Sequence, residues 1–63
     1  MKKTIEEILM KYNESEYDKI VLDYEGDIEE FEHQWDLQEA GVPMDEDATY
    51  KLKNRVLTLT VRG

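Results

Sequence analysis

The stretch LDYEGDIEEFEHQWDLQE, residues 22–39, decides how this chain folds, because two different periodicities can be read in it. It contains the only Phe and the only Trp of the chain, and it contains no Lys or Arg. So much negative charge around aromatic residues indicates a solvated face, a metal site or a surface that meets a cationic partner. The eight carboxylates of the stretch are Asp23, Glu25, Asp27, Glu29, Glu30, Glu32, Asp36 and Glu39.

The first periodicity is that of a helix over residues 27–41. Asp27 is then the N-cap, and Gly41 ends the helix. Leu37 and Val42 stand where a Schellman motif places its hydrophobic pair. We favour this helix because Glu, Gln, Leu and Ala dominate its later half.

The second periodicity is that of a strand, in which Phe31, His33, Trp35 and Leu37 alternate with polar residues and one helical turn follows at 37–40. On both readings we expect Phe31 and Trp35 to lie in the core and the carboxylates to form one continuous acidic surface. A partly exposed Trp35, acting as an interface anchor ringed by charge, is the alternative. On the helix, the acidic stripe would consist of Glu29, Glu32, Asp36 and Glu39.

The flanking segments have clearer patterns. Thr4 and Glu7 form a capping box before a helix over residues 5–12. Residues 19–24, rich in β-branched and aromatic side chains, predict a strand. Residues 43–48 read as a loop, and residues 50–52 and 55–61 read as two strands around a tight turn. The helix is expected to bury a stripe of Ile5, Ile8, Leu9 and Tyr12.

These elements follow one another as helix, strand, helix, strand and strand. The order predicts a small α+β fold, with an antiparallel sheet of about three strands and one or two helices. Sixty-three residues predict a single domain over residues 1–63, with a small core that no disulfide can reinforce, because there is no Cys.

The charge is distributed unevenly along the chain. The formal net charge is -8, from 16 acids and 8 bases, and residues 12–50 hold 14 of the acids and only one base, Lys19. Such a centre repels nucleic acid and anionic membranes and favours a basic protein surface. The sequence shows no signal peptide and no apolar stretch long enough to span a membrane, so we expect a cytoplasmic protein.

The sequence offers little that would support catalysis or metal binding. His33 is the only His, and no Cys or second His can complete a zinc site or a nucleophilic triad. Asp45, Glu46 and Asp47 could hold a hard cation together with Asp23 or Asp27, but no EF-hand pattern is present. We therefore interpret the run as a solvated loop that extends the acidic surface. We therefore expect no enzymatic activity, no cofactor and no metal.

The leading hypothesis is a non-enzymatic protein that blocks a basic, nucleic-acid-binding site on a partner protein. Carboxylates would take the place of phosphates and pair with Arg and Lys, and there would be no direct contact with nucleic acid or membrane. The predicted partner-binding residues are Asp23, Glu25, Asp27, Glu29, Glu30, Glu32, Asp36, Glu39, Asp45, Glu46 and Asp47.

In size and charge, over its whole length, the chain resembles the small acidic inhibitors encoded by phages and mobile elements, such as DNA mimics and anti-CRISPR proteins. The resemblance implies a single-domain, non-catalytic inhibitor that acts in the cytoplasm of a host cell. It rests on no motif, so it assigns no role to any residue. The alternative is an accessory subunit or antitoxin whose acidic face only solubilises it and whose contact is the open edge of the C-terminal strand.

Overall fold

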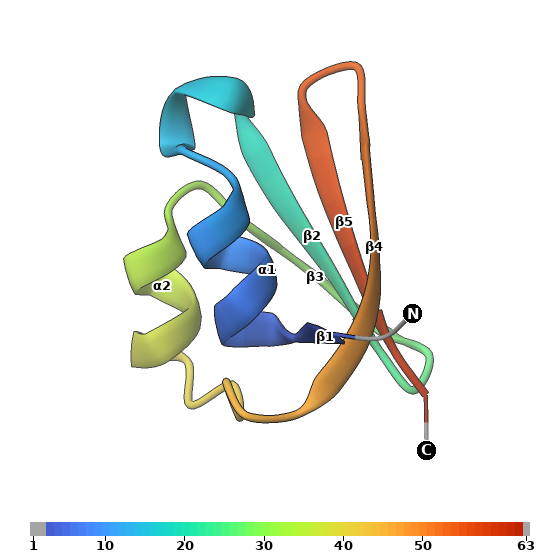
Figure 1. Cartoon of the computed structure of the whole chain (residues 1–63). Coiled ribbons are helices and arrows are strands. Elements are labelled where there is room, and N and C mark those ends of the chain that lie inside the picture. Colours follow the sequence, from blue (N-terminus) through green and yellow to red (C-terminus); the bar gives the residue numbers. More distant parts are fainter. Residues whose placement is uncertain (1–2, 63) are drawn as a thin grey trace.

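The computed structural model describes residues 3–62 and shows a two-layer α+β fold (Figure 1). Within residues 3–62, two helices lie on one face of a five-stranded sheet, and no helix of these residues lies on the other face. No helix within residues 3–62 is long and apolar enough to cross a membrane. The elements in chain order are β1 (Lys3–Thr4), α1 (Ile5–Lys11), a 3-10 turn η1 (Glu14–Glu16), β2 (Lys19–Tyr24), β3 (Asp27–Phe31), α2 (Gln34–Glu39), β4 (Asp47–Lys53) and β5 (Val56–Val61).

The sheet is mixed, with the strand order β1-β4-β5-β2-β3. Strands β2 and β5 pair in parallel, and every other pairing is antiparallel. The predicted α+β class is thus confirmed, while the expected count of about three antiparallel strands is wrong. Because β5 lies between β4 and β2, it has no open edge. The expectation that a partner contacts an open edge of the C-terminal strand is therefore also wrong.

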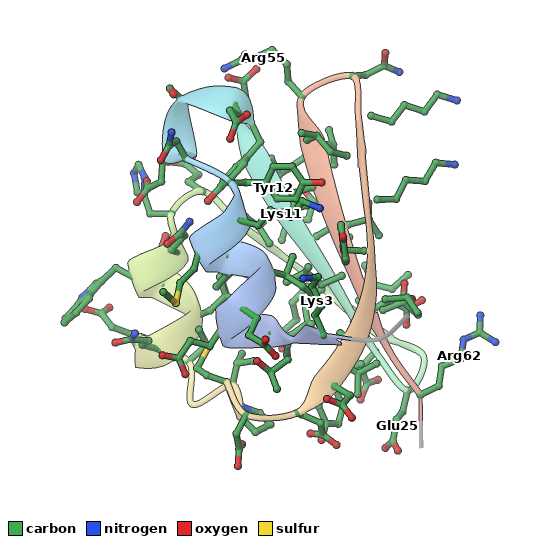
Figure 2. All side chains as sticks on the ribbon, in the orientation of Figure 1. Lys3, Lys11, Tyr12, Glu25, Arg55 and Arg62 are labelled. Atoms are coloured by element: carbon green, nitrogen blue, oxygen red, sulfur yellow. The ribbon has the colours of Figure 1, made fainter. Side chains whose placement is uncertain are left out.

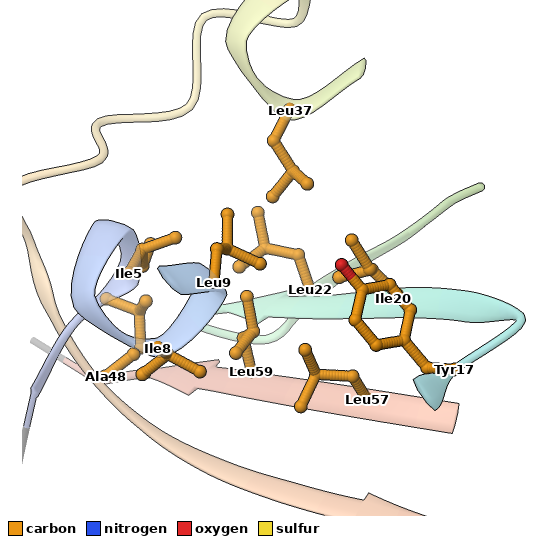
Figure 3. Close-up of a cluster of buried hydrophobic side chains, with 11 residues drawn as sticks. Ile5, Ile8, Leu9, Tyr17, Ile20, Leu22, Leu37, Ala48, Leu57 and Leu59 are labelled. Atoms are coloured by element: carbon orange, nitrogen blue, oxygen red, sulfur yellow. The ribbon is translucent and has the colours of Figure 1, made fainter. Parts of the chain in front are cut away.

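The core lies between the helices and the sheet (Figure 3). From the helical layer, Ile5, Ile8 and Leu37 are fully buried, and Leu9 is nearly so. The alternation expected of the last strand is confirmed, because every second residue of β5 faces this core while Thr58 and Thr60 face the other side. The buried cluster consists of Ile5, Ile8, Leu9, Tyr17, Ile20, Leu22, Leu37, Ala48, Leu57, Leu59 and Val61.

The start of α1 confirms the predicted capping box. The Glu7 backbone N–H donates to the Thr4 hydroxyl at 3.2 Å, and the Thr4 backbone N–H donates to the Glu7 carboxylate at 3.1 Å. These bonds satisfy backbone donors that a helix N-terminus otherwise leaves unpaired. The helix ends at Lys11, one residue earlier than expected, and Tyr12 follows it in an extended conformation.

Residues 27–31 form a strand, so the favoured helix over 27–41 is wrong in its first part. Glu25 and Gly26 make a two-residue turn with φ of 50° and 98°, and all five residues of β3 then pair with β2. Positive φ at both central positions is what a type I′ hairpin turn requires, and Gly26 adopts it without strain. The pairing places Phe31 beside Ile20, where it packs against the core.

The end of the predicted helix is confirmed in α2. The Val42 N–H donates to the Leu37 carbonyl, and the Gly41 N–H donates to the Gln38 carbonyl, each at 3.1 Å. These are the two bonds of a Schellman motif, and Gly41 has the expected positive φ of 81°. The alternative reading, a strand followed by a short helix, comes closer overall, but this strand ends at Phe31 and the helix is longer than one turn.

Candidate partner-binding surface

Seven of the eleven predicted partner-binding carboxylates gather at one end of the molecule, which we call the acidic end. Two segments distant in sequence meet here, because the Tyr24 hydroxyl donates to the Glu46 carboxylate at 2.6 Å and Tyr24 is opposite Asp27 in the β2–β3 pairing. This hydrogen bond is the main reason why the pKa of Tyr24 is raised. The acidic end comprises Asp23, Glu25, Asp27, Glu29, Asp45, Glu46 and Asp47. Asp27 and Glu29 share the helical side of the sheet with Tyr24, whereas Asp23 is paired with Ile28 on the other side.

Shallow hollows border these carboxylates. Asp23 and Glu25 line one of about 470 Å³ at the C-terminal ends of the parallel strands, together with Arg62. Asp27 and Glu29 line another of about 230 Å³, whose other walls are Tyr24 and the residues after α2. The acidic end is therefore an uneven surface with charged rims and no enclosed cavity.

Ion pairing within residues 3–62 leaves the acidic end unneutralised. The three ion pairs found there are Lys19–Glu30, His33–Glu14 and Arg55–Asp18, with distances of 3.0, 3.1 and 3.1 Å. None of them includes a residue of the acidic end. The negative charge of this surface is consequently available to a cationic partner.

The strand register explains why the charge is polarised. At one end of the sheet, Lys19 and Lys53 both lie beside Val56, and Arg55 forms the adjoining turn. At the other end, Asp23 lies beside Thr60. Figure 2 shows Arg55 and Glu25 at opposite ends of the molecule. Lys53 and Arg55 therefore lie at the end opposite Glu25, whereas Arg62 borders the acidic end beside Asp23 and Glu25. Of the basic residues after position 50, only Arg55 makes an ion pair within the described residues, with Asp18.

The remaining four predicted carboxylates do not join the acidic end. Glu30 pairs with Lys19, and Glu32 follows β3 toward the opposite end. Asp36 accepts a hydrogen bond from the His33 backbone N–H at the start of α2, and Glu39 accepts one from the Trp35 indole. The acidic stripe expected along a helix is therefore wrong, because Glu29 lies on a strand and Asp36 caps a separate helix.

His33 lies on the surface, with its Nδ1 3.1 Å from Glu14 and most of its side chain exposed. Within residues 3–62, no three His, Asp or Glu side chains lie close enough together to hold a metal ion. The run at 45–47 thus does not converge with Asp23 or Asp27 on a cation site among these residues.

The expectation that Trp35 lies in the core is wrong, while the exposure that the alternative foresaw is confirmed. The side chain of Trp35 is 63% exposed, whereas Phe31 packs against the core as expected. The helix starts at Gln34, which turns Leu37 inward and Trp35 outward. Sequence reasoning also missed Met10, 78% exposed on α1, and Met44, which lines the same hollow as Trp35. The exposure of Met10 could have been predicted from the sequence, because Met10 lies outside the apolar stripe of α1.

Comparisons with protein-family models, with curated proteins and with solved structures found no match for this chain.

Proposed function

We propose that this protein is a non-enzymatic inhibitor whose acidic end occupies a basic, nucleic-acid-binding site on a partner protein. The observation that carries the proposal is that seven carboxylates, from the β2–β3 hairpin and residues 45–47, lie at one end of the molecule and take part in none of the ion pairs found within residues 3–62. Gathering like charges in a small domain opposes folding. A cationic partner would relieve this repulsion.

The spacing on β3 supports the role of phosphate substitute. Asp27 and Glu29 are two residues apart on one strand face, which separates them by about 6.8 Å along the strand. Phosphates recur at regular intervals along a nucleic-acid strand, and the two carboxylates likewise present two anionic groups in a row along β3. Arg and Lys side chains arranged to follow a nucleic-acid backbone could therefore pair with both.

A second candidate is an interaction module whose contact is apolar and whose charge only keeps it soluble. The exposure of Trp35 and Met10 favours it. Salt dependence distinguishes the two functions, because binding through the acidic end weakens strongly as salt rises and apolar binding does not.

The test is affinity capture with the whole chain from a bacterial lysate at low salt, followed by measurement of the affinity for each captured protein. Two double variants, with substitutions in β3 or directly after it, each remove two negative charges and so form a matched pair. Asp27→Asn with Glu29→Gln removes two charges of the acidic end, whereas Glu30→Gln with Glu32→Gln removes two charges outside it.

The proposal predicts capture of a nucleic-acid-binding protein whose affinity falls about ten-fold in the first variant, because two charge-assisted contacts are lost. The second variant should change the affinity by less than about two-fold. Equal affinities for wild type and the first variant would overturn the proposal.

A further inference from the structure

A groove of about 310 Å³ separates α1 from α2 on the helical side of the molecule. Its apolar lining consists of Leu9, Met10, Trp35 and Met44. Three large hydrophobic side chains are exposed within residues 3–62, and two of them, Met10 and Trp35, line this groove. The third, Ile28, lies on β3 and faces the uncovered side of the sheet.

The groove has the features of a contact site for a variable apolar surface. Trp35 is oriented by the 2.6 Å hydrogen bond from its Nε1 to Glu39, so an aromatic face is held in place without being buried. The flexible Met10 and Met44 can adapt to the shape of an incoming side chain. Exposed Trp and Met side chains rimmed by polar groups are typical of interaction sites.

The charge around the groove specifies the partner. Glu6 and Glu14 line it, Glu39 holds the indole, and no Lys or Arg among the described residues takes part in the lining. Lys11, although it belongs to α1, is directed away: its Nζ donates to the Tyr50 hydroxyl at 3.1 Å (Figure 2). An occupant with apolar residues and flanking positive charges is complementary to this surface.

We infer that this groove binds a basic amphipathic helix of the partner protein, an inference that rests on the proposed function and names the element that the inhibitor recognises. The seven residues of α1 span about 10 Å, which matches about two turns of a partner helix. Two apolar residues one turn apart would fill the groove, and Lys or Arg on either side would meet the glutamates. Basic helices of this kind are common nucleic-acid-binding elements.

Trp35 is the only Trp of the chain, so its fluorescence reports directly on the groove. The probe is a synthetic peptide of about 18 residues, made of Leu and Lys with all Leu on one helical face. The control peptide has the same composition in an order that gives no apolar face. We expect a saturable blue shift of the emission with the first peptide and at least about ten-fold weaker binding of the second.

Met10→Ser and Ile28→Ser provide matched variants, because each removes an exposed apolar side chain from a different side of the molecule. Met10→Ser should weaken peptide binding about ten-fold, and Ile28→Ser by less than about two-fold. Circular dichroism should show both variants folded. Equal binding of the two peptides, or equal effects of the two variants, would overturn the inference. So would sedimentation showing a dimer that Met10→Ser dissociates, because the groove would then bind a second copy.

Met10→Ser and the Asp27→Asn, Glu29→Gln variant together separate this inference from the proposed function. If a captured partner loses affinity with the Asp27→Asn, Glu29→Gln variant but not with Met10→Ser, the acidic end is the contact and the groove inference is wrong. If only Met10→Ser weakens the partner, the groove is a contact and the proposed use of the acidic end is wrong.

Discussion

The indole Nε1 of Trp35 donates a 2.6 Å hydrogen bond to the carboxylate of Glu39, one turn later in α2, while the indole itself remains 63% exposed. The helix therefore directs its largest side chain away from the core and fixes it there. Two residues along, Leu37 is fully buried and supplies the contact of α2 with the core. Within one short helix, Trp35 thus belongs to the surface and Leu37 to the core.

This division predicts unequal effects on stability. Trp35→Ala should lower the free energy of unfolding by less than about 1 kcal/mol, since most of the side chain is already in water. Leu37→Ala should lower it by about 2–5 kcal/mol, because it leaves a cavity in the core. Urea unfolding followed by circular dichroism measures both. A loss for Trp35→Ala as large as that for Leu37→Ala would place the indole in the core.

Gln34 joins the two helices and should be important for stability despite its polarity. The two N–H groups of its Nε2 are shared among three acceptors, the Leu9 carbonyl at 3.0 Å, the Tyr12 carbonyl at 3.3 Å and the Tyr17 hydroxyl at 2.7 Å. Gln34→Ala leaves these part-buried acceptors without a donor, so we expect a loss of about 1–3 kcal/mol in urea unfolding. Gln38→Ala, at an exposed position of the same helix, should cost less than about 0.5 kcal/mol, and similar losses would contradict this role.

The capping box predicts a defined pH dependence. The Thr4 backbone N–H, followed by the Thr4 hydroxyl, lowers the pKa of Glu7 below its ordinary value. A carboxyl whose pKa is lowered in the folded state stabilises the fold above its unfolded pKa, and this contribution is lost as the pH falls through the folded pKa. Wild type should therefore exceed Glu7→Gln in stability at neutral pH, and the difference should vanish in acid.

Thermal unfolding of both chains over a pH series measures this difference. Glu6→Gln removes a charge from the same helical turn without breaking the capping box, so it controls for the interaction with the helix dipole. A wild-type advantage over Glu7→Gln that grows as the pH falls would contradict the capping box as its source.

Gly41 should be replaceable only at the expense of backbone strain. A Cβ at this position meets no atom within 4 Å, so space is not the obstacle, but φ is +81°. Gly41→Ala should lower the free energy of unfolding by about 1–2 kcal/mol. Gly41→Asn should cost less, because Asn tolerates this conformation better. Equal stability of wild type and Gly41→Ala in urea would show that the Schellman motif is not maintained.

Local sequence patterns were sufficient to predict those elements whose structure depends only on neighbouring residues. The Thr4–Glu7 box, residues 19–24 and the Schellman motif at Gly41 each depend on neighbours within a few positions, and each is confirmed. The segment 27–31 could not be assigned in this way, because Asp, Glu and Ile there fit either state. Pairing with β2 decides it, and that is a tertiary interaction.

The acidic end shows the same limit. That the β2–β3 hairpin and residues 45–47 meet at one end of the molecule depends on the contact between Tyr24 and Glu46, 22 residues apart. The parallel pairing of β2 with β5, which sends Lys19 and Asp23 to opposite ends of the sheet, also has no local signature. Composition alone predicted one continuous acidic surface through the central segment, but the fold places Glu30, Asp36 and Glu39 away from the acidic end.

Competition with nucleic acid tests the central claim most directly. A labelled duplex is bound to a purified, captured partner at low salt and then titrated with the whole chain. We predict complete displacement, with the required concentration about ten-fold higher for the Asp27→Asn, Glu29→Gln variant and changed by less than about two-fold for Glu30→Gln, Glu32→Gln. A ternary complex in which the partner holds the duplex and this protein together would contradict the account.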